Sequence, residues 1–161
     1  MSIPRRIREY LEENDVRYDW LPHPQAYTTQ EVAHSLHISG KRLAKTVVLD
    51  ADGQLLMAVL PAAHHLDLDK FKREVEAKRL EMLPESELAE LFPDCDLGAI
   101  PPFGNLYGMD VWLEKSLTGS AEFVFTAGTH RDAVRMELSE FTALVNPSIG
   151  QFAEQVAAAA A

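Results

Sequence analysis

The chain has 161 residues, of which 47% are hydrophobic, and a formal net charge of −10 at pH 7. This length fits one domain that can bury its own core without disulfide or metal staples. An acidic chain repels the phosphate backbone except where cations cluster, so general binding of DNA is excluded and any RNA contact should be local. No apolar run reaches the roughly 18 residues that a membrane span requires.

Cysteine usage limits the chemistry further. The single cysteine, Cys95, permits neither an internal disulfide nor a cysteine-based zinc cluster. A lone cysteine and no apparent secretory signal predict a reducing, cytoplasmic setting.

The first third of the chain predicts two helices around one strand. Residues 3–13 carry an i, i+4, i+7, i+8 apolar stripe, which is typical of an amphipathic helix. A strand over residues 17–21 ends at two prolines. Thr28 and Glu31 have the spacing of a capping box and predict a second short helix, which Gly40 terminates.

The clearest strand signal lies in residues 46–60. Residues 46–50 and 54–60 are apolar runs joined by Ala-Asp-Gly, which predicts a β-hairpin. Because residues 55–60 are apolar at every position, the second strand should be central and covered on both faces. Asp67 is expected to cap the next helix, and two prolines, Pro84 and Pro93, to bound another.

The second half predicts strands at residues 109–113, 122–126 and 133–138, and then a helix at 141–145 capped by Ser139. No repeat or linker interrupts the chain. We therefore predict an α+β fold: one domain over residues 1–156, with a central mixed, mostly antiparallel sheet flanked by helices. The alanines at 157–161 are expected to fray.

Familiar enzyme signatures are missing, among them phosphate loops, the Gly-x-Ser-x-Gly elbow and His-Glu-x-x-His. The best metal candidate is the pair His64 and His65. Adjacent side chains in a strand point to opposite faces, so we reject a metal site and expect no cofactor.

A stiff loop at residues 98–104, Gly-Ala-Ile-Pro-Pro-Phe-Gly, is the first candidate for a site. Paired prolines restrict the backbone. The N–H groups of Gly98, Ala99 and Ile100 could then converge on one oxyanion. A plain turn between a helix and a strand has the same composition, so both interpretations stay open.

Lys45 and the segment around His130 are the other candidates. A lysine entering an apolar strand could present its ammonium to a phosphate or carboxylate, or could be a simple edge charge. His130 and Arg131 could contact a ligand, or could decorate a hairpin loop.

The order of these motifs resembles the YbaK-like aminoacyl-tRNA deacylases, the family of the editing domain inserted in bacterial prolyl-tRNA synthetases. The resemblance covers residues 3–146. It rests on His23-Pro24, Thr28 to Ala33, Ala44-Lys45-Thr46, Leu66–Leu68, Gly98–Gly104 and Ala127-Gly128.

The resemblance implies a mixed sheet with surrounding helices, no metal, and hydrolysis of the ester between an amino acid and the terminal adenosine of tRNA. It implies that Lys45 binds the substrate end and that residues 98–102 hold the aminoacyl group. Hydrolysis would use the ribose hydroxyl of the substrate and a water molecule. The predicted catalytic residues are Lys45, Gly98, Ala99 and Ile100. The predicted substrate contacts are His23, Tyr27, Pro101, Pro102, Phe103, Gly104, Gly128, Thr129 and His130. Many relatives are Gly-rich where this chain has Gly128-Thr129-His130-Arg131, so this loop is expected to bear on substrate choice.

We therefore predict a free-standing trans-editing hydrolase that removes a small amino acid, Ala, Ser or Thr, from mischarged tRNA. Its expected partners are the aminoacylated acceptor end and an aminoacyl-tRNA synthetase or elongation factor. One alternative is a non-catalytic module that binds an aminoacyl end, a nucleotide or a synthetase surface. Another is hydrolysis of a different small aminoacyl ester or amide.

Overall fold

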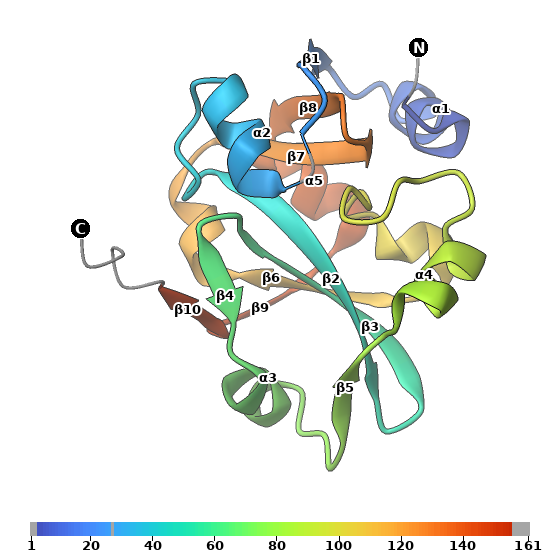
Figure 1. Cartoon of the computed structure of the whole chain (residues 1–161), viewed down its shortest axis with the longest axis vertical. Helices are drawn as coiled ribbons and strands as arrows, with labels where there is room; N and C mark the ends of the chain where they lie inside the picture. The colour runs from blue at the N-terminus through green and yellow to red at the C-terminus, as the bar shows by residue number, and fades with distance from the viewer. Residues whose placement is uncertain (1–2, 27, 156–161) are drawn as a thin grey trace.

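The predicted hairpin forms the centre of a mixed eight-stranded sheet (Figure 1). The computed structural model describes residues 3–26 and 28–155, and its strand order is β1-β8-β7-β2-β3-β6-β9, with β5 paired to β2. The strands are β1 (Tyr18–Pro22), β2 (Leu43–Ala51), β3 (Gln54–Pro61), β5 (Leu80–Met82), β6 (Asp110–Glu114), β7 (Glu122–Thr129), β8 (Asp132–Glu137) and β9 (Ser148–Gly150). The pairs β2·β7, β3·β6 and β6·β9 are parallel and the other four are antiparallel, which confirms a mixed, mostly antiparallel sheet.

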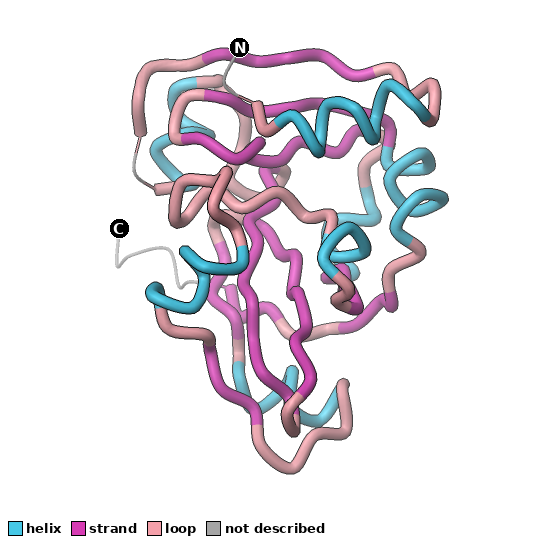
Figure 2. Tube along the Cα trace, turned by 90° about the vertical axis from the view of Figure 1, so that its right-hand side faces the viewer, coloured by secondary structure: helices cyan, strands magenta, loops and turns pink. Residues whose placement is uncertain are grey.

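Helices lie on both sides of the strands (Figure 2). They are α1 (Arg5–Glu13), α2 (Thr29–Ser35), α3 (Leu68–Glu74), α4 (Glu85–Leu91) and α5 (Leu138–Val145), with short 3₁₀ helices η1 (Gly104–Tyr107) and η2 (Lys115–Gly119). Each helix within the described ranges is too short or too polar to cross a lipid bilayer.

Two of the predicted helix caps are confirmed and one is wrong. The Glu31 N–H donates to Thr28 Oγ1 at 3.1 Å, and the Lys70 N–H donates to Asp67 Oδ1 at 3.0 Å. Ser139 is not the cap of α5, because the helix already begins at Leu138 and Glu137 occupies the cap position without a side-chain bond.

The patterns did not predict the strands of three residues. Besides β5 and β9, these are β4 (His64–Leu66) and β10 (Ala153–Gln155), which form a separate two-stranded sheet. Segments this short carry little periodicity of their own, and cross-strand pairing stabilises them. His64 and His65 thus lie within β4.

Both faces of β3 are covered, as its continuous apolar sequence predicts. Met57 and Val59 enter the largest core cluster, together with aromatic residues of β7 and α5. Leu56, Ala58 and Leu60 enter a second cluster on the opposite face, with Phe71 of α3. A third cluster lies beneath α2. The alternation of side chains along a strand divides β3 between the two faces of the sheet.

A buried carboxylate fixes the segment before β10. Glu114 Oε1 accepts the N–H groups of Phe152 at 3.1 Å and Ala153 at 3.3 Å, and Oε2 accepts the Ser116 N–H at 2.7 Å. Burial alone would raise the pKa of Glu114, but the hydrogen bonds from Ser116, Ala153 and Phe152 outweigh burial and hold the pKa below its usual 4.5.

Glu114→Gln is therefore expected to destabilise the fold at neutral pH by about 1–3 kcal/mol, the usual loss for a hydrogen-bonded buried charge. Because the folded-state pKa is lowered, the contribution is present above the unfolded-state pKa and is lost as pH falls through the folded-state value. Urea unfolding from pH 7 to pH 3 should show the wild type and the variant converging in acid. An equal change for the exposed control Glu13→Gln would contradict this role.

Candidate functional site

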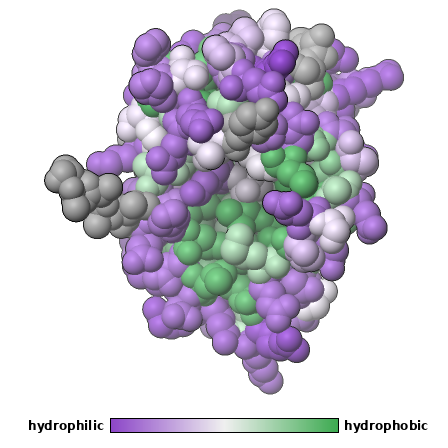
Figure 3. Space-filling view, in the orientation of Figure 1, coloured by the Kyte–Doolittle hydropathy of each residue, from purple (hydrophilic) through white to green (hydrophobic). Residues whose placement is uncertain are grey.

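An opening in the sheet lies between β2 and β7. The two strands pair only at Leu43↔Val124 and Ala44↔Phe125. Farther along the same edge, β2 pairs with β5 from Leu49 onward. The backbone groups of residues 45–47 thus lie between two paired stretches, where β2 and β7 have diverged. Figure 3 shows this face hollowed above the upper part of β2, next to a continuous hydrophobic patch.

Lys45 is the first residue of β2 beyond the paired stretch. Strand alternation places its side chain on the same face as Leu43 and Val47, between the apolar cluster beneath α2 and the one beneath α3. Its Nζ donates to the Ala62 carbonyl at a long 3.4 Å. Within the described ranges, no carboxylate lies within ion-pair distance of this ammonium. Burial lowers the pKa of Lys45, so an anion at this position would stabilise its charged form.

The proline loop, defined as residues 98–104, begins on the β7 side of the opening. The Gly128 N–H donates to the Ala99 carbonyl at 2.7 Å, and the Gly128 carbonyl accepts the Asp96 N–H at 2.7 Å. Residues 96–99 thus occupy the edge of β7 that β2 has left. Lys45 and the start of the proline loop flank the same opening from its two sides.

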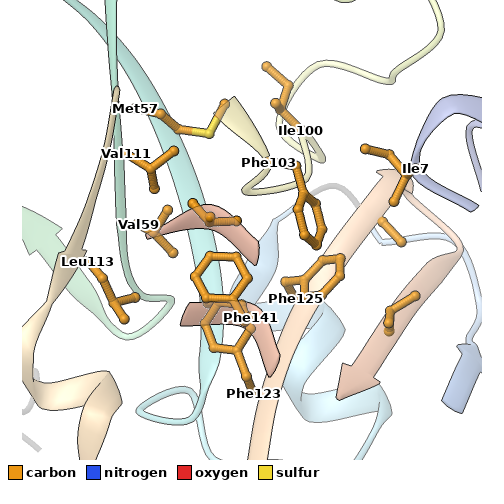
Figure 4. Packing of buried hydrophobic residues seen from close by; sticks show 14 of the residues in the cluster. Ile7, Met57, Val59, Ile100, Phe103, Val111, Leu113, Phe123, Phe125 and Phe141 are labelled. Carbon is orange, nitrogen blue, oxygen red and sulfur yellow. The ribbon is translucent and has the colours of Figure 1, made fainter. Parts of the chain in front are cut away.

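The proline loop is buried from Ala99 to Gly104, and part of it belongs to the core (Figure 4). Ile100 is 4% exposed and Phe103 is fully buried, and both belong to the largest core cluster. The Phe103 ring packs edge-on against Phe125 and Phe141, at 5.4 and 5.6 Å between centroids. Phe103 and Gly104 are therefore buried and anchor the loop, and their contact with substrate stays a prediction. A buried anchor and a pocket wall share the same apolar residue types, so the sequence alone could not separate them.

Pro101 and Pro102 are also buried, whereas Gly98 is exposed. The Ala99 N–H donates to the Asp96 carbonyl at 3.1 Å, so it is already used within the turn. The N–H groups of Gly98 and Ile100 have no hydrogen-bond partner among the described residues. Of the three N–H groups predicted to bind an oxyanion, those of Gly98 and Ile100 therefore remain available.

Gly128 is buried, with a φ of +91°. A Cβ atom there would collide with the Cγ and Cδ atoms of Pro4. The glycine therefore allows Pro4 to pack against the backbone of the β7–β8 loop, which we define as residues 127–131. The positive φ and the close packing of Pro4 therefore explain why glycine is required at this position.

The neighbours of Gly128 hold the β7–β8 loop. Thr129 Oγ1 donates to the buried carboxylate of Asp132 and accepts the Arg131 N–H at 3.0 Å. The His130 carbonyl accepts the Ala26 N–H at 3.0 Å. The patterns did not single out Asp132, although an aspartate directly after a predicted loop is a signal for such a role.

His23 approaches this loop from β1, and its N–H donates to the Arg131 carbonyl at 2.8 Å. Its Nδ1 lies 2.8 Å from the Pro24 carbonyl, which can only accept, so Nδ1 carries a proton, and in the neutral ring Nε2 is an acceptor. Nε2 is buried and has no partner among the described residues. Tyr27, the remaining predicted contact, lies outside the described residues.

Cys95 precedes the proline loop but is unsuited to nucleophilic attack. Burial, with a smaller contribution from the negative charge of Asp94, raises the pKa of its thiol to about 12. Only the thiolate is a good nucleophile. Within the described residues, no group of His, Cys, Asp and Glu side chains is arranged to hold a metal ion.

We expect iodoacetamide to alkylate Cys95 at pH 8 at least about a hundredfold more slowly than free cysteine, whose pKa is about 8.5. Mass spectrometry of timed aliquots would measure the rate, with protein unfolded in guanidinium as the reactive control. Equal rates for folded and unfolded protein would contradict a protected thiol.

Comparison with known proteins determines the family. Residues 23–144 match the family model described as the aminoacyl-tRNA editing domain. The chain belongs to the aminoacyl-tRNA editing domain family. The matched range contains Lys45, the proline loop and the β7–β8 loop.

Two curated proteins are similar to this editing domain over different lengths. Over 79 residues, 49% of the chain, it is 30% identical to a proline–tRNA ligase of Lysinibacillus sphaericus (strain C3-41), of which the match spans 14%. Over 144 residues, 88% of the chain, it is 24% identical to the uncharacterised protein YwhH of Bacillus subtilis (strain 168), of which the match spans 89%. The chain thus corresponds to a small part of the ligase and to most of YwhH.

The fold of the editing domain also has solved relatives. A crystal structure of a candidate trans-editing enzyme for prolyl tRNA synthetase superposes with a TM-score of 0.81 at 23% identity. The superposition covers 93% of this chain and 96% of the other. The predicted fold class is therefore confirmed.

Proposed function

We propose that this editing domain acts in trans as a deacylase. It hydrolyses the ester that joins a small amino acid, Ala, Ser or Thr, to the terminal adenosine of a mischarged tRNA. Water adds to the ester carbonyl, the carbon–oxygen bond to the ribose breaks, and the products are the free amino acid and the tRNA with its hydroxyl restored. A vicinal ribose hydroxyl of the substrate is assigned the transfer of a proton to the leaving oxygen.

The half-buried ammonium of Lys45 is the observation that carries this proposal. Among the described residues, the Lys45 ammonium makes one hydrogen bond, at 3.4 Å to the Ala62 carbonyl, and has no carboxylate at ion-pair distance, so it has capacity for an anionic ligand. The tRNA end supplies phosphates within a few ångströms of the scissile ester. Electrostatic attraction at this point needs no basic surface, which is consistent with a net charge of −10.

The proposal assigns the developing oxyanion to the N–H groups of Gly98 and Ile100. A backbone donor held in place stabilises charge that develops only in the transition state, and removing one such donor typically slows catalysis by about 10²–10³. The buried prolines and the Phe103 anchor keep this segment from reorganising. An aminoacyl ester is already activated, so positioning and oxyanion stabilisation are sufficient without a protein nucleophile.

Substrate choice is assigned to the space between Lys45, the start of the proline loop and the β7–β8 loop. A hydrophobic pocket distinguishes one methylene by about 1–3 kcal/mol, so the size of this space would exclude larger amino acids. The acceptor Nε2 of His23 offers a partner for a donor on the substrate, such as an ammonium or a hydroxyl group.

A deacylation panel tests the proposal. Purified protein is incubated with tRNAs mischarged with Ala, Ser, Thr and larger amino acids, and release of the labelled amino acid is followed over time. Turnover confined to the small amino acids is expected. Tight binding of the aminoacylated tRNA without any turnover would instead identify a non-catalytic binding module. Equal rates on aminoacyl-adenosine and on full tRNA would identify a hydrolase of small aminoacyl esters.

A further inference from the structure

Asp96 joins the two loops on the β7 side of the opening between β2 and β7, namely the proline loop and the β7–β8 loop. Its N–H donates to the Gly128 carbonyl at 2.7 Å, and its carbonyl accepts the Ala99 N–H at 3.1 Å. Its side-chain Oδ2 accepts the His130 N–H at 3.0 Å. The Gly128 N–H, which donates to the Ala99 carbonyl at 2.7 Å, completes the junction. Asp96 thus takes part in three of the four hydrogen bonds.

The carboxylate bond is the one that a side-chain substitution can remove. The other three bonds link backbone atoms and persist in any variant whose backbone keeps its course. A hydrogen bond to a charged acceptor is stronger than a neutral one. The carboxylate of Asp96 binds the N–H of His130, while the carbonyl of His130 accepts the Ala26 N–H at 3.0 Å. The backbone of His130 is therefore fixed at both its N–H and its carbonyl.

The placement of Asp96 couples the predicted oxyanion donors to the β7–β8 loop. Gly98 and Ile100 are two and four residues after Asp96. The turn of residues 96–99 is closed by the hydrogen bond from the Ala99 N–H to the Asp96 carbonyl. A shift of about 1 Å at such donors is enough to lower a rate a hundredfold. Because Asp96 is exposed, its side chain contributes little to the apolar core.

We propose that Asp96 is a positioning residue: its carboxylate aligns the start of the proline loop with the β7–β8 loop on the β7 side of the site. This inference rests on the proposed deacylase function for its effect on rate. The alignment itself can be measured in the absence of any activity.

The test compares Asp96→Ala with Asp96→Asn and with Asp94→Ala. The asparagine retains a carbonyl oxygen that can accept the His130 N–H, whereas alanine cannot. Asp94 is an exposed neighbour whose carboxylate accepts a weak hydrogen bond from the Cys95 thiol at 3.8 Å. Asp94→Ala is therefore the matched control for loss of one negative charge. Deacylation kinetics, thermal midpoint and amide hydrogen exchange of His130 are measured for all four proteins.

We expect Asp96→Ala to lower kcat about tenfold or more with KM changed less than threefold, and to accelerate exchange of the His130 amide. Asp96→Asn should recover most of kcat, and Asp94→Ala should match the wild type. Equal losses in Asp96→Ala and Asp94→Ala, or unchanged exchange at His130 in Asp96→Ala, would overturn the inference. If the wild type proves inactive, the deacylase proposal fails, and the exchange measurement still decides whether Asp96 aligns the loops.

Discussion

Lys45→Ala is expected to lower kcat/KM for deacylation by about 30-fold or more while leaving the fold intact. Removing one partner of a desolvated charge pair typically costs 2–5 kcal/mol, which corresponds to about 30- to several-thousandfold. The effect should be large because the Lys45 side chain lies between two apolar clusters, where screening by water is weak. The free energy of unfolding should change little, since burial already disfavours the charged ammonium, as its lowered pKa indicates.

The kinetic form of the loss is informative. If Lys45 binds the phosphate of the tRNA end in ground state and transition state alike, KM rises and kcat is preserved. If it also acts on developing charge, kcat falls. Steady-state deacylation of one mischarged tRNA, measured in parallel with urea unfolding, distinguishes these cases.

Lys41→Ala is the matched control, because Lys41 is an exposed cation on the same approach to β2. Its loss should change the rate less than about threefold, as expected for a solvated charge. Comparable losses in the two variants would mean that general attraction of the tRNA, and not a defined contact at Lys45, governs the rate.

Gly128→Ala is expected to destabilise the protein by about 2–5 kcal/mol and to abolish activity with it. A side chain at the left-handed φ of +91° carries a backbone cost of roughly 1–2 kcal/mol. The added Cβ would also collide with the buried ring of Pro4, and such overpacking typically costs a further 1–3 kcal/mol. Since both backbone groups of Gly128 bond to residues 96–99, any shift that relieves the collision moves the proline loop.

Gly53→Ala separates the two costs. Gly53 has a φ of +90°, and a Cβ there would meet nothing within 4 Å, so only the backbone cost applies. In urea unfolding, the free energy of unfolding of Gly128→Ala should be about 1–3 kcal/mol lower than that of Gly53→Ala. Adding Pro4→Gly to Gly128→Ala should recover part of that difference. Equal stabilities for the two single variants would show that the contact of residue 128 with Pro4 adds no cost to the alanine substitution.

Local sequence patterns predicted the elements whose signal is contained within a few residues. The Ala-Asp-Gly turn between two apolar runs specifies the β2–β3 hairpin, because turn and strands are adjacent in the chain. The same holds for the caps at Thr28 and Asp67, where donor and acceptor are three residues apart. Strands of three residues lack such a signal, which is why β4 and β10 were missed.

The sequence by itself determined the order of motifs that places Lys45 at the entry of β2 and a proline loop some fifty residues later, and this order sufficed to indicate the family. Tertiary structure alone decided that β2 and β7 part after two residue pairs, that Asp96 and Gly128 close the β7 side of the opening, and that Phe103 belongs to the core. The physical reason is separation along the chain. These contacts join residues up to about 80 positions apart, so no local periodicity encodes them, and they form only when the whole sheet has assembled.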